Sequence, residues 1–78
     1  MDMKQTFTAV FAKESDGYTV TVPALPGLVT AGRTLKEAKA MAREAIECHL
    51  ESLRKDGQPI PPEIKVDVER LEVEFAAR

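Results

Sequence analysis

Residues 17–27 read Gly17-Tyr18-Thr19-Val20-Thr21-Val22-Pro23-Ala24-Leu25-Pro26-Gly27. Apolar and threonine side chains alternate from Tyr18 to Val22, and this two-residue period in β-prone residue types predicts a strand. Pro23 and Pro26 carry no backbone N–H, so a hydrogen-bonded ladder cannot continue through them. A rigid loop over residues 23–27 is therefore expected after the strand.

The segment before this strand has the same period. Phe7, Ala9 and Phe11 alternate with threonines over residues 5–13, which predicts a second strand. The sequence Glu14-Ser15-Asp16-Gly17 between the two strands is typical of a turn, because Asp and Ser bond to nearby backbone and Gly accepts a positive φ. The two strands should form a hairpin. Its polar face, the one expected to stay open, carries Thr6, Thr8, Thr19 and Thr21.

Beyond the loop, the sequence predicts a short third strand from Leu28 to Ala31 and then a helix from about Leu35 to Lys55. Thr34 is a favourable N-cap, and Glu37 three residues later completes a capping box. At about 100° per residue, the apolar stripe of this helix comprises Leu35, Ala38, Ala42, Ala45, Ile46, His49 and Leu53.

The C-terminal segment predicts a fourth strand after a stiff, proline-rich connector at residues 58–62. Apolar residues alternate over residues 64–68 and again over residues 71–75, but with opposite parity, so a break is expected near Glu69-Arg70. The fourth strand is placed at Arg70 to Phe75. The expected class is α+β: a small β-β-β-α-β domain whose antiparallel sheet carries one long amphipathic helix on one face.

Composition narrows the function classes. The chain has 78 residues, 44% of them hydrophobic and 31% charged, which suits one small globular domain rather than a disordered chain. A net charge of −2 argues against a nucleic-acid binder acting alone. One cysteine and an opening without a signal-peptide pattern predict a cytoplasmic protein, and no apolar run approaches the length of a membrane helix.

The residues capable of chemistry are few and scattered. His49 could act as a general base or ligand, but its place in the apolar stripe favours a neutral core histidine. Cys48 could be a nucleophile, yet its glutamate neighbours do not stabilise a thiolate, and a half-buried packing role is favoured. The carboxylates do not converge as metal-dependent hydrolysis requires. No catalytic residue, cofactor or metal is expected, and the chain is not expected to be an enzyme.

Three segments in fixed order carry a family resemblance. Residues 17–27 resemble the hairpin and Leu-Pro-Gly loop of the HicB-like antitoxin family, and residues 30–38 (Thr-Ala-Gly-Arg-Thr-Leu-Lys-Glu-Ala) are similar to its strand-to-helix junction. Residues 44–51 (Glu-Ala-Ile-Glu-Cys-His-Leu-Glu) and 56–61 (Asp-Gly-Gln-Pro-Ile-Pro) resemble its helix and helix exit. The resemblance covers about residues 5–75 and implies a single HicB-like domain over residues 1–78.

The resemblance also implies a fold and a role. The fold is a partial RNase H-like sheet with one helix, without the carboxylates of the nuclease. The role is to bind and occlude a small basic, mRNA-cleaving toxin of the HicA type. The chain departs from the family pattern at Leu28, where many members have cysteine, and no C-terminal DNA-binding module is expected after Phe75.

The sequence therefore predicts a non-catalytic protein-binding module, a HicB-type antitoxin, that also forms a homo-dimer or tetramer and binds neither membrane nor nucleic acid directly. Two alternatives remain open: a stand-alone homo-oligomer that has lost its toxin partner, and a nucleic-acid-binding vestigial nuclease. The residues expected to contact a partner lie on the open sheet face and the following loop: Thr19, Thr21, Pro23, Leu25, Pro26 and Gly27.

Overall fold

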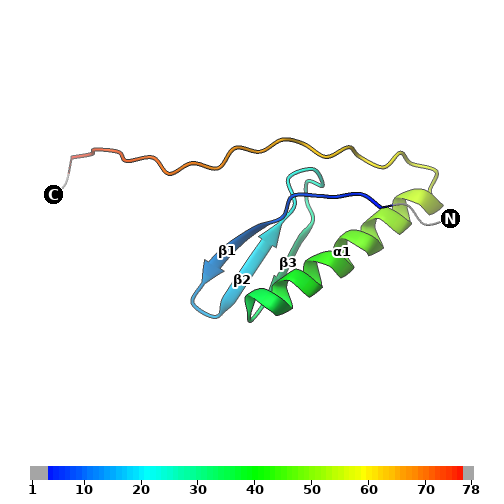
Figure 1. The fold of residues 1–78 in the computed structure, drawn as a ribbon, viewed down its shortest axis with the longest axis horizontal. Helices are drawn as coiled ribbons and strands as arrows, with labels where there is room; N and C mark the ends of the chain where they lie inside the picture. The colour runs from blue at the N-terminus through cyan, green and yellow to red at the C-terminus, as the bar shows by residue number, and fades with distance from the viewer. Residues whose placement is uncertain (1–3, 77–78) are drawn as a thin grey trace.

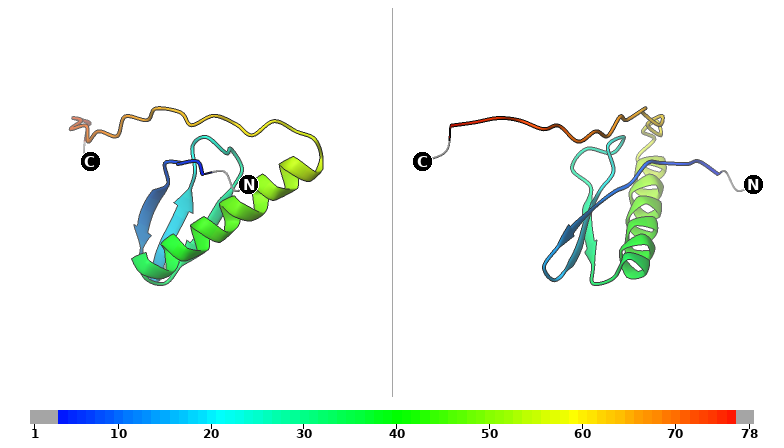
Figure 2. Two further views of the ribbon diagram at one scale, coloured as in Figure 1. Left: turned by 45° about the vertical axis from the view of Figure 1, so that its right-hand side comes forward. Right: turned by 60° about the vertical axis from the view of Figure 1, so that its left-hand side comes forward.

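A sheet of three strands and one helix make up the folded body. The computed structural model describes residues 4–76. Strands β1 (Val10–Glu14), β2 (Gly17–Thr21) and β3 (Val29–Gly32) form an antiparallel sheet in the order β1-β2-β3, followed by helix α1 (Leu35–Lys55). The helix covers one face of the sheet and leaves the other uncovered (Figures 1 and 2). The predicted α+β class is confirmed, and the helix has the predicted bounds.

The sheet is shorter at its first strand than the sequence predicts. The register places Val10 opposite Thr21, so that Thr8 would fall opposite Pro23 if the ladder continued. Because Pro23 has no N–H to donate, pairing ends at Val10 and residues 5–9 run on without a partner strand. The strand predicted over residues 5–13 is therefore confirmed only in its second half.

The core is small and lies between the central strand and the first half of the helix. Val20 and Ala38 are fully buried and Ala42 is 4% exposed, with Phe11 and Tyr18 packed around them. The alanines allow the helix to approach the sheet closely. At Gly32 the approach is closest, because a Cβ there would lie 2.4 Å from the backbone nitrogen of Ala38.

The helix begins and ends at residues that satisfy its free backbone groups. The Oγ1 of Thr34 accepts a hydrogen bond from the backbone N–H of Glu37 at 3.0 Å, which confirms the predicted N-cap. The Oε1 of Glu37 accepts from the N–H of Arg33, one residue earlier than in a standard capping box. At the other end, the amides of Gly57 and Gln58 donate to the carbonyls of Arg54 and Leu53, which forms a Schellman motif.

Replacing Thr34 with alanine should lower the free energy of unfolding by about 1 kcal/mol, because the amide of Glu37 loses its acceptor. Replacing Thr34 with aspartate keeps an acceptor at that position and should leave the stability within about 0.5 kcal/mol. Urea denaturation followed by circular dichroism measures both. Equal losses in the two variants would show that the cap does not stabilise the helix.

The second half of the helix extends beyond the sheet. Its 21 residues span about 30 Å, whereas a five-residue strand spans about 17 Å. Ala45, Ile46 and Leu53 are consequently only half-buried. The predictions of a core His49 and a half-buried Cys48 are wrong, because both side chains are exposed.

The C-terminal segment forms no strand within the described residues. From residue 58 to residue 76 the chain is extended but pairs with no strand, so the fourth strand predicted at Arg70 to Phe75 is not formed in the isolated chain. The segment runs away from the sheet and makes the molecule 59 Å long (Figure 1). The radius of gyration is 15.9 Å, against about 11.5 Å for a compact chain of this size.

Candidate partner-binding surface

The uncovered face of the sheet is built from two rows of side chains that the register aligns. Val10, Thr21 and Val29 are directly opposite one another across the three strands. Because side chains alternate along a strand, the next row on this face joins Ala12, Thr19 and Ala31. We call these six residues the outer face. Thr19 and Thr21 thus lie on the face away from the helix, as the alternation predicts.

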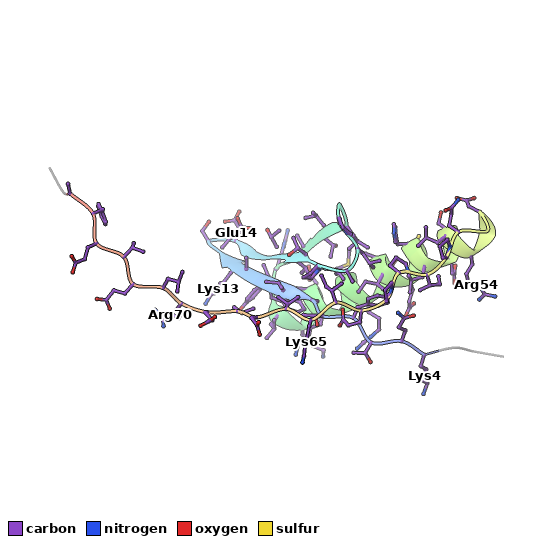
Figure 3. All side chains as sticks on the ribbon, turned by 90° about the horizontal axis from the view of Figure 1, so that it is seen from above. Lys4, Lys13, Glu14, Arg54, Lys65 and Arg70 are labelled. Atoms are coloured by element: carbon purple, nitrogen blue, oxygen red, sulfur yellow. The ribbon has the colours of Figure 1, made fainter. Side chains whose placement is uncertain are left out.

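The outer face has small side chains and carries no formal charge. Val29 is 62% exposed, and Ala12, Thr21 and Ala31 are exposed as well. The carboxylate of Glu14, at the end of β1, lies at the margin of this face (Figure 3). Its Oε1 accepts a hydrogen bond from the Thr19 hydroxyl. A β-rich, uncharged surface of this kind suits contact with another protein rather than chemistry.

The predicted loop consists of two consecutive turns. The amide of Leu25 donates to the carbonyl of Val22 at 2.9 Å, and the amide of Leu28 donates to the carbonyl of Leu25 at 3.1 Å. Proline occupies the second position of each turn, where its fixed φ is favoured. Gly27 has φ of +90°, the positive value that a type II turn needs at its third position. The Leu-Pro-Gly sequence therefore dictates the shape of the loop.

The side chains of the loop divide between core and surface. Leu25 is 2% exposed and Ala24 is 7% exposed, so both point into the protein and fix the loop in place. Pro26 and Gly27 are exposed at the tip. Of the predicted contact residues in the loop, Leu25 therefore supports the loop from inside, whereas Pro26 and Gly27 are accessible at its tip.

The tip of the loop also borders an open hollow against the projecting half of the helix. The hollow has a volume of about 540 Å³ and is lined by Pro26, Gly27, Leu28, Ala45, Cys48, His49 and Ser52. The predicted contact residues therefore belong to two places: Thr19 and Thr21 lie on the outer face, and Pro26 and Gly27 lie beside the helix. Cys48 and His49, assigned to packing from the sequence, line the second of these places.

The sequence prediction missed four of the six residues of the outer face: Val10, Ala12, Val29 and Ala31. Val10, Val29 and Ala31 stand beside the two threonines, and Val29 is the most exposed apolar side chain of the folded body. The signal was present, because Val29 and Ala31 alternate with Leu28 and Thr30 in the predicted third strand. The sequence does not reveal the register between β2 and β3, which places Val29 and Ala31 on the same face of the sheet as Thr19 and Thr21.

The described residues contain neither a metal-binding cluster nor a membrane-spanning helix. Over residues 4–76, no group of three or more histidine, cysteine or carboxylate side chains is arranged to hold a metal ion. Within the same range, no helix is both long enough and apolar enough to cross a membrane.

Comparisons with known proteins agree with these features. The family model described as "HicB_like antitoxin of bacterial toxin-antitoxin system" matches residues 7–78. A UPF0150 protein of Thermoplasma acidophilum is 48% identical over 56 residues, which cover 70% of this chain and 81% of that protein. A UPF0150 protein of Helicobacter pylori is 34% identical over 68 residues, 87% of this chain and 94% of its own length.

A third relative, the UPF0150 protein of Synechocystis, is 41% identical over 58 residues and covers 73% of each chain. No solved structure gives a significant match. The family model spans nearly the whole chain, including the Leu-Pro-Gly turns and the capped helix described above. The chain therefore belongs to the HicB-like antitoxin family of bacterial toxin–antitoxin systems.

Proposed function

We propose that this protein is a HicB-type antitoxin that binds a small, basic, HicA-like mRNA-cleaving toxin and occludes its active site. Membership in the family supports a role in a toxin–antitoxin system in general. The observation that carries the finer proposal is the outer face, whose small side chains are uncharged and uncovered within the described residues. Occlusion of an active site requires surface complementarity and no catalytic group on the inhibitor.

The charge of the chain supports a basic partner. Its net charge is −2, and Glu14 and Asp16 lie at the hairpin end of the outer face. Acidic residues at this end of an uncharged face would favour the approach of a basic protein. The exposed side of α1 mixes Lys39 and Arg43 with Glu44 and Glu47, so it offers no single sign of charge to such a partner.

The proposal treats the protein as a non-catalytic, cytoplasmic, single-domain module that also associates with itself as a dimer or tetramer. His49 and Cys48 have no partner group that would activate them among the hydrogen bonds of the described residues. Sequestration of a nuclease by a protein surface accounts for the outer face without any cofactor.

Replacing both Thr19 and Thr21 with lysine should weaken binding of the cognate toxin by roughly 100-fold or more, because like charges brought together across an interface cost several kcal/mol. The test partner is the cognate HicA-like toxin of the proposal, and isothermal titration calorimetry measures the dissociation constant. Both positions face away from the core, so the variant should keep its helix signal by circular dichroism.

The matched control reverses two charges on the helix, Glu47→Lys and Glu51→Lys, which also adds positive charge but on the opposite side of the protein. This variant should lose less than about fivefold in affinity, as expected of exposed charges away from the contact. If the glutamate variant loses the toxin and the threonine variant does not, the outer face is not the binding surface.

A further inference from the structure

The extended C-terminal segment exposes more large apolar side chains than the rest of the protein. We call residues 64–75 the arm. Its apolar residues are between 36% and 83% exposed: Ile64, Val66, Val68, Leu71, Val73 and Phe75. A run of large exposed apolar side chains marks a surface that binds another molecule, because covering it removes apolar area from water.

The root of the arm already lies beside the N-terminal extension of β1. The Nε2 of Gln5 donates a hydrogen bond to the carbonyl of Pro61 at 3.0 Å, and the Thr8 hydroxyl donates to Oε2 of Glu63 at 2.9 Å. The two segments run in the same direction, because the earlier residues of both segments contact each other and so do the later ones. Residues 5–8, which precede β1, therefore bind residues 61–63 in a parallel orientation.

The two contacts differ by one residue in register, and the proposed pairing takes the one nearer to β1, that of Thr8 with Glu63. Continued by two residues at a time, it places Asp67 beside Ala12 and Glu69 beside Glu14, where β1 ends. It also puts Ile64, Val66 and Val68 on the core-side face of the sheet, the face of Ala9 and Phe11. The parity change at residues 69–70 coincides with the end of the strand that the arm would pair with.

Within its own chain, the arm does not lie along the free edge of β1. After Glu63 the arm continues straight while β1 turns toward the hairpin (Figure 1). Figure 3 shows Arg70 lying past the hairpin end marked by Lys13 and Glu14. The prolines at positions 59, 61 and 62 have fixed φ angles and stiffen the connector that directs the arm outward.

We propose that the arm pairs as a parallel strand with the free edge of β1 in a second copy of this chain, so that two copies exchange arms around a two-fold axis. β1 has β2 on one side only, so each copy offers one such edge. The inference deepens the self-association included in the proposed function, and it is independent of toxin binding. Exchange of an identical element is a low-cost route to a dimer.

Charge complementarity supports a second copy as the occupant. The arm carries four acidic and two basic residues, whereas residues 4–14, which include β1 and its extension, carry two lysines and one glutamate. In net charge, an acidic strand added to a basic edge is favourable, and the like-charged pair Glu69 and Glu14 falls at the end of β1, where the pairing stops. The pairing would also satisfy the backbone groups of two exposed strands at once. If the arm bound a toxin rather than a second copy, the purified full chain would be monomeric, which the sedimentation experiment below detects.

Sedimentation equilibrium tests the role of the arm in self-association. The full chain should sediment as a dimer, and a chain that ends at Glu63 should sediment as a monomer with an unchanged helix signal. Both hydrogen bonds of the root and all strands and helix residues are kept in the shorter chain. Dimers that persist without the arm would overturn the exchange while leaving self-association in place, and a monomeric full chain would overturn both.

A pair of neighbouring substitutions tests the proposed register in the full chain. Val66→Asn should weaken the dimer by roughly tenfold or more, because an apolar side chain that the register places beside Phe11 becomes polar. Asp67→Asn lies on the opposite side of the arm and should change the dimer constant by about twofold or less. Equal effects would contradict the register.

Disulfide trapping distinguishes exchange from closure within one chain. In a Cys48→Ser background, one copy carries Ala12→Cys and a second copy of different mass carries Asp67→Cys. Mixing and mild oxidation should give a covalent heterodimer. A disulfide that forms only when both cysteines are in one chain would show that the arm closes on its own β1. The absence of any disulfide would show that the arm binds elsewhere, and either outcome overturns the proposal.

Discussion

Replacing Gly32 with alanine is expected to lower the free energy of unfolding by about 3 kcal/mol or more, a large part of the stability of so small a domain. A Cβ at this position would lie 2.4 Å from the backbone nitrogen and 2.6 Å from the Cα of Ala38. These atoms belong to the helix backbone, so no side-chain rotation can relieve the overlap. The helix would have to move away from the sheet, which would open the core around Val20.

Gly57→Ala is the matched control for this prediction. Gly57 has φ of +70°, but an added Cβ there would meet no atom within 4 Å. The substitution should therefore cost only the backbone strain of about 1 kcal/mol. Urea denaturation of the two variants separates the two effects. If Gly32→Ala costs no more than Gly57→Ala, the helix does not rest on the strand as closely as described.

Replacing Leu25 with alanine is expected to destabilise the protein by about 3 kcal/mol, within the range for a buried leucine that leaves a cavity. Leu25 is 2% exposed, and its backbone amide and carbonyl hold both turns of the loop. The variant should also loosen the loop tip at Pro26 and Gly27, which borders the hollow. Thermal unfolding and hydrogen exchange of the loop amides measure the two effects.

Val29→Ala serves as the comparison at the other end of the same loop. Val29 is 62% exposed on the outer face, so its truncation should change the stability by less than about 0.5 kcal/mol. If Leu25→Ala proves as stable as Val29→Ala yet binds the toxin poorly, Leu25 is a contact residue and the assignment of its side chain to the core is mistaken.

The sequence predicts local structure well where a few neighbouring residues determine it. Thr34 and Glu37 define the start of the helix, and Gly57 its end, because capping depends on residues three or four positions apart. The hairpin is also local, since the turn at residues 15–16 fixes which residues pair. Here the prediction and the structure agree to within one residue for β2 and α1.

The prediction fails where a distant segment decides the outcome. His49 belongs to the apolar stripe by periodicity, yet it is exposed because the sheet is shorter than the helix, and periodicity does not report the length of the facing sheet. The fourth strand fails for a related reason. Its alternating residues are β-prone, but a strand requires a neighbouring edge, and the described part of the isolated chain does not bring one to residues 64–75.

The candidate binding surface falls between these cases. Alternation alone assigns Thr19 and Thr21 to one face of β2, and the register then adds Val10 and Val29 on either side. The loop residues were grouped with them because they are adjacent in sequence. The side chains of Leu25 and Pro26 nevertheless point to different surroundings, which only the folding of the two turns determines.

The claim that the outer face occludes a toxin is tested most directly by RNA cleavage. The cognate HicA-like toxin of the proposal is incubated with an mRNA substrate, alone and with an equimolar amount of this chain, and the intact RNA is quantified over time. The account predicts that the unmodified chain protects the RNA, and that a folded chain carrying Thr19→Lys and Thr21→Lys does not. Cleavage that proceeds unchanged with the unmodified chain, or equal protection by the lysine variant, would contradict it.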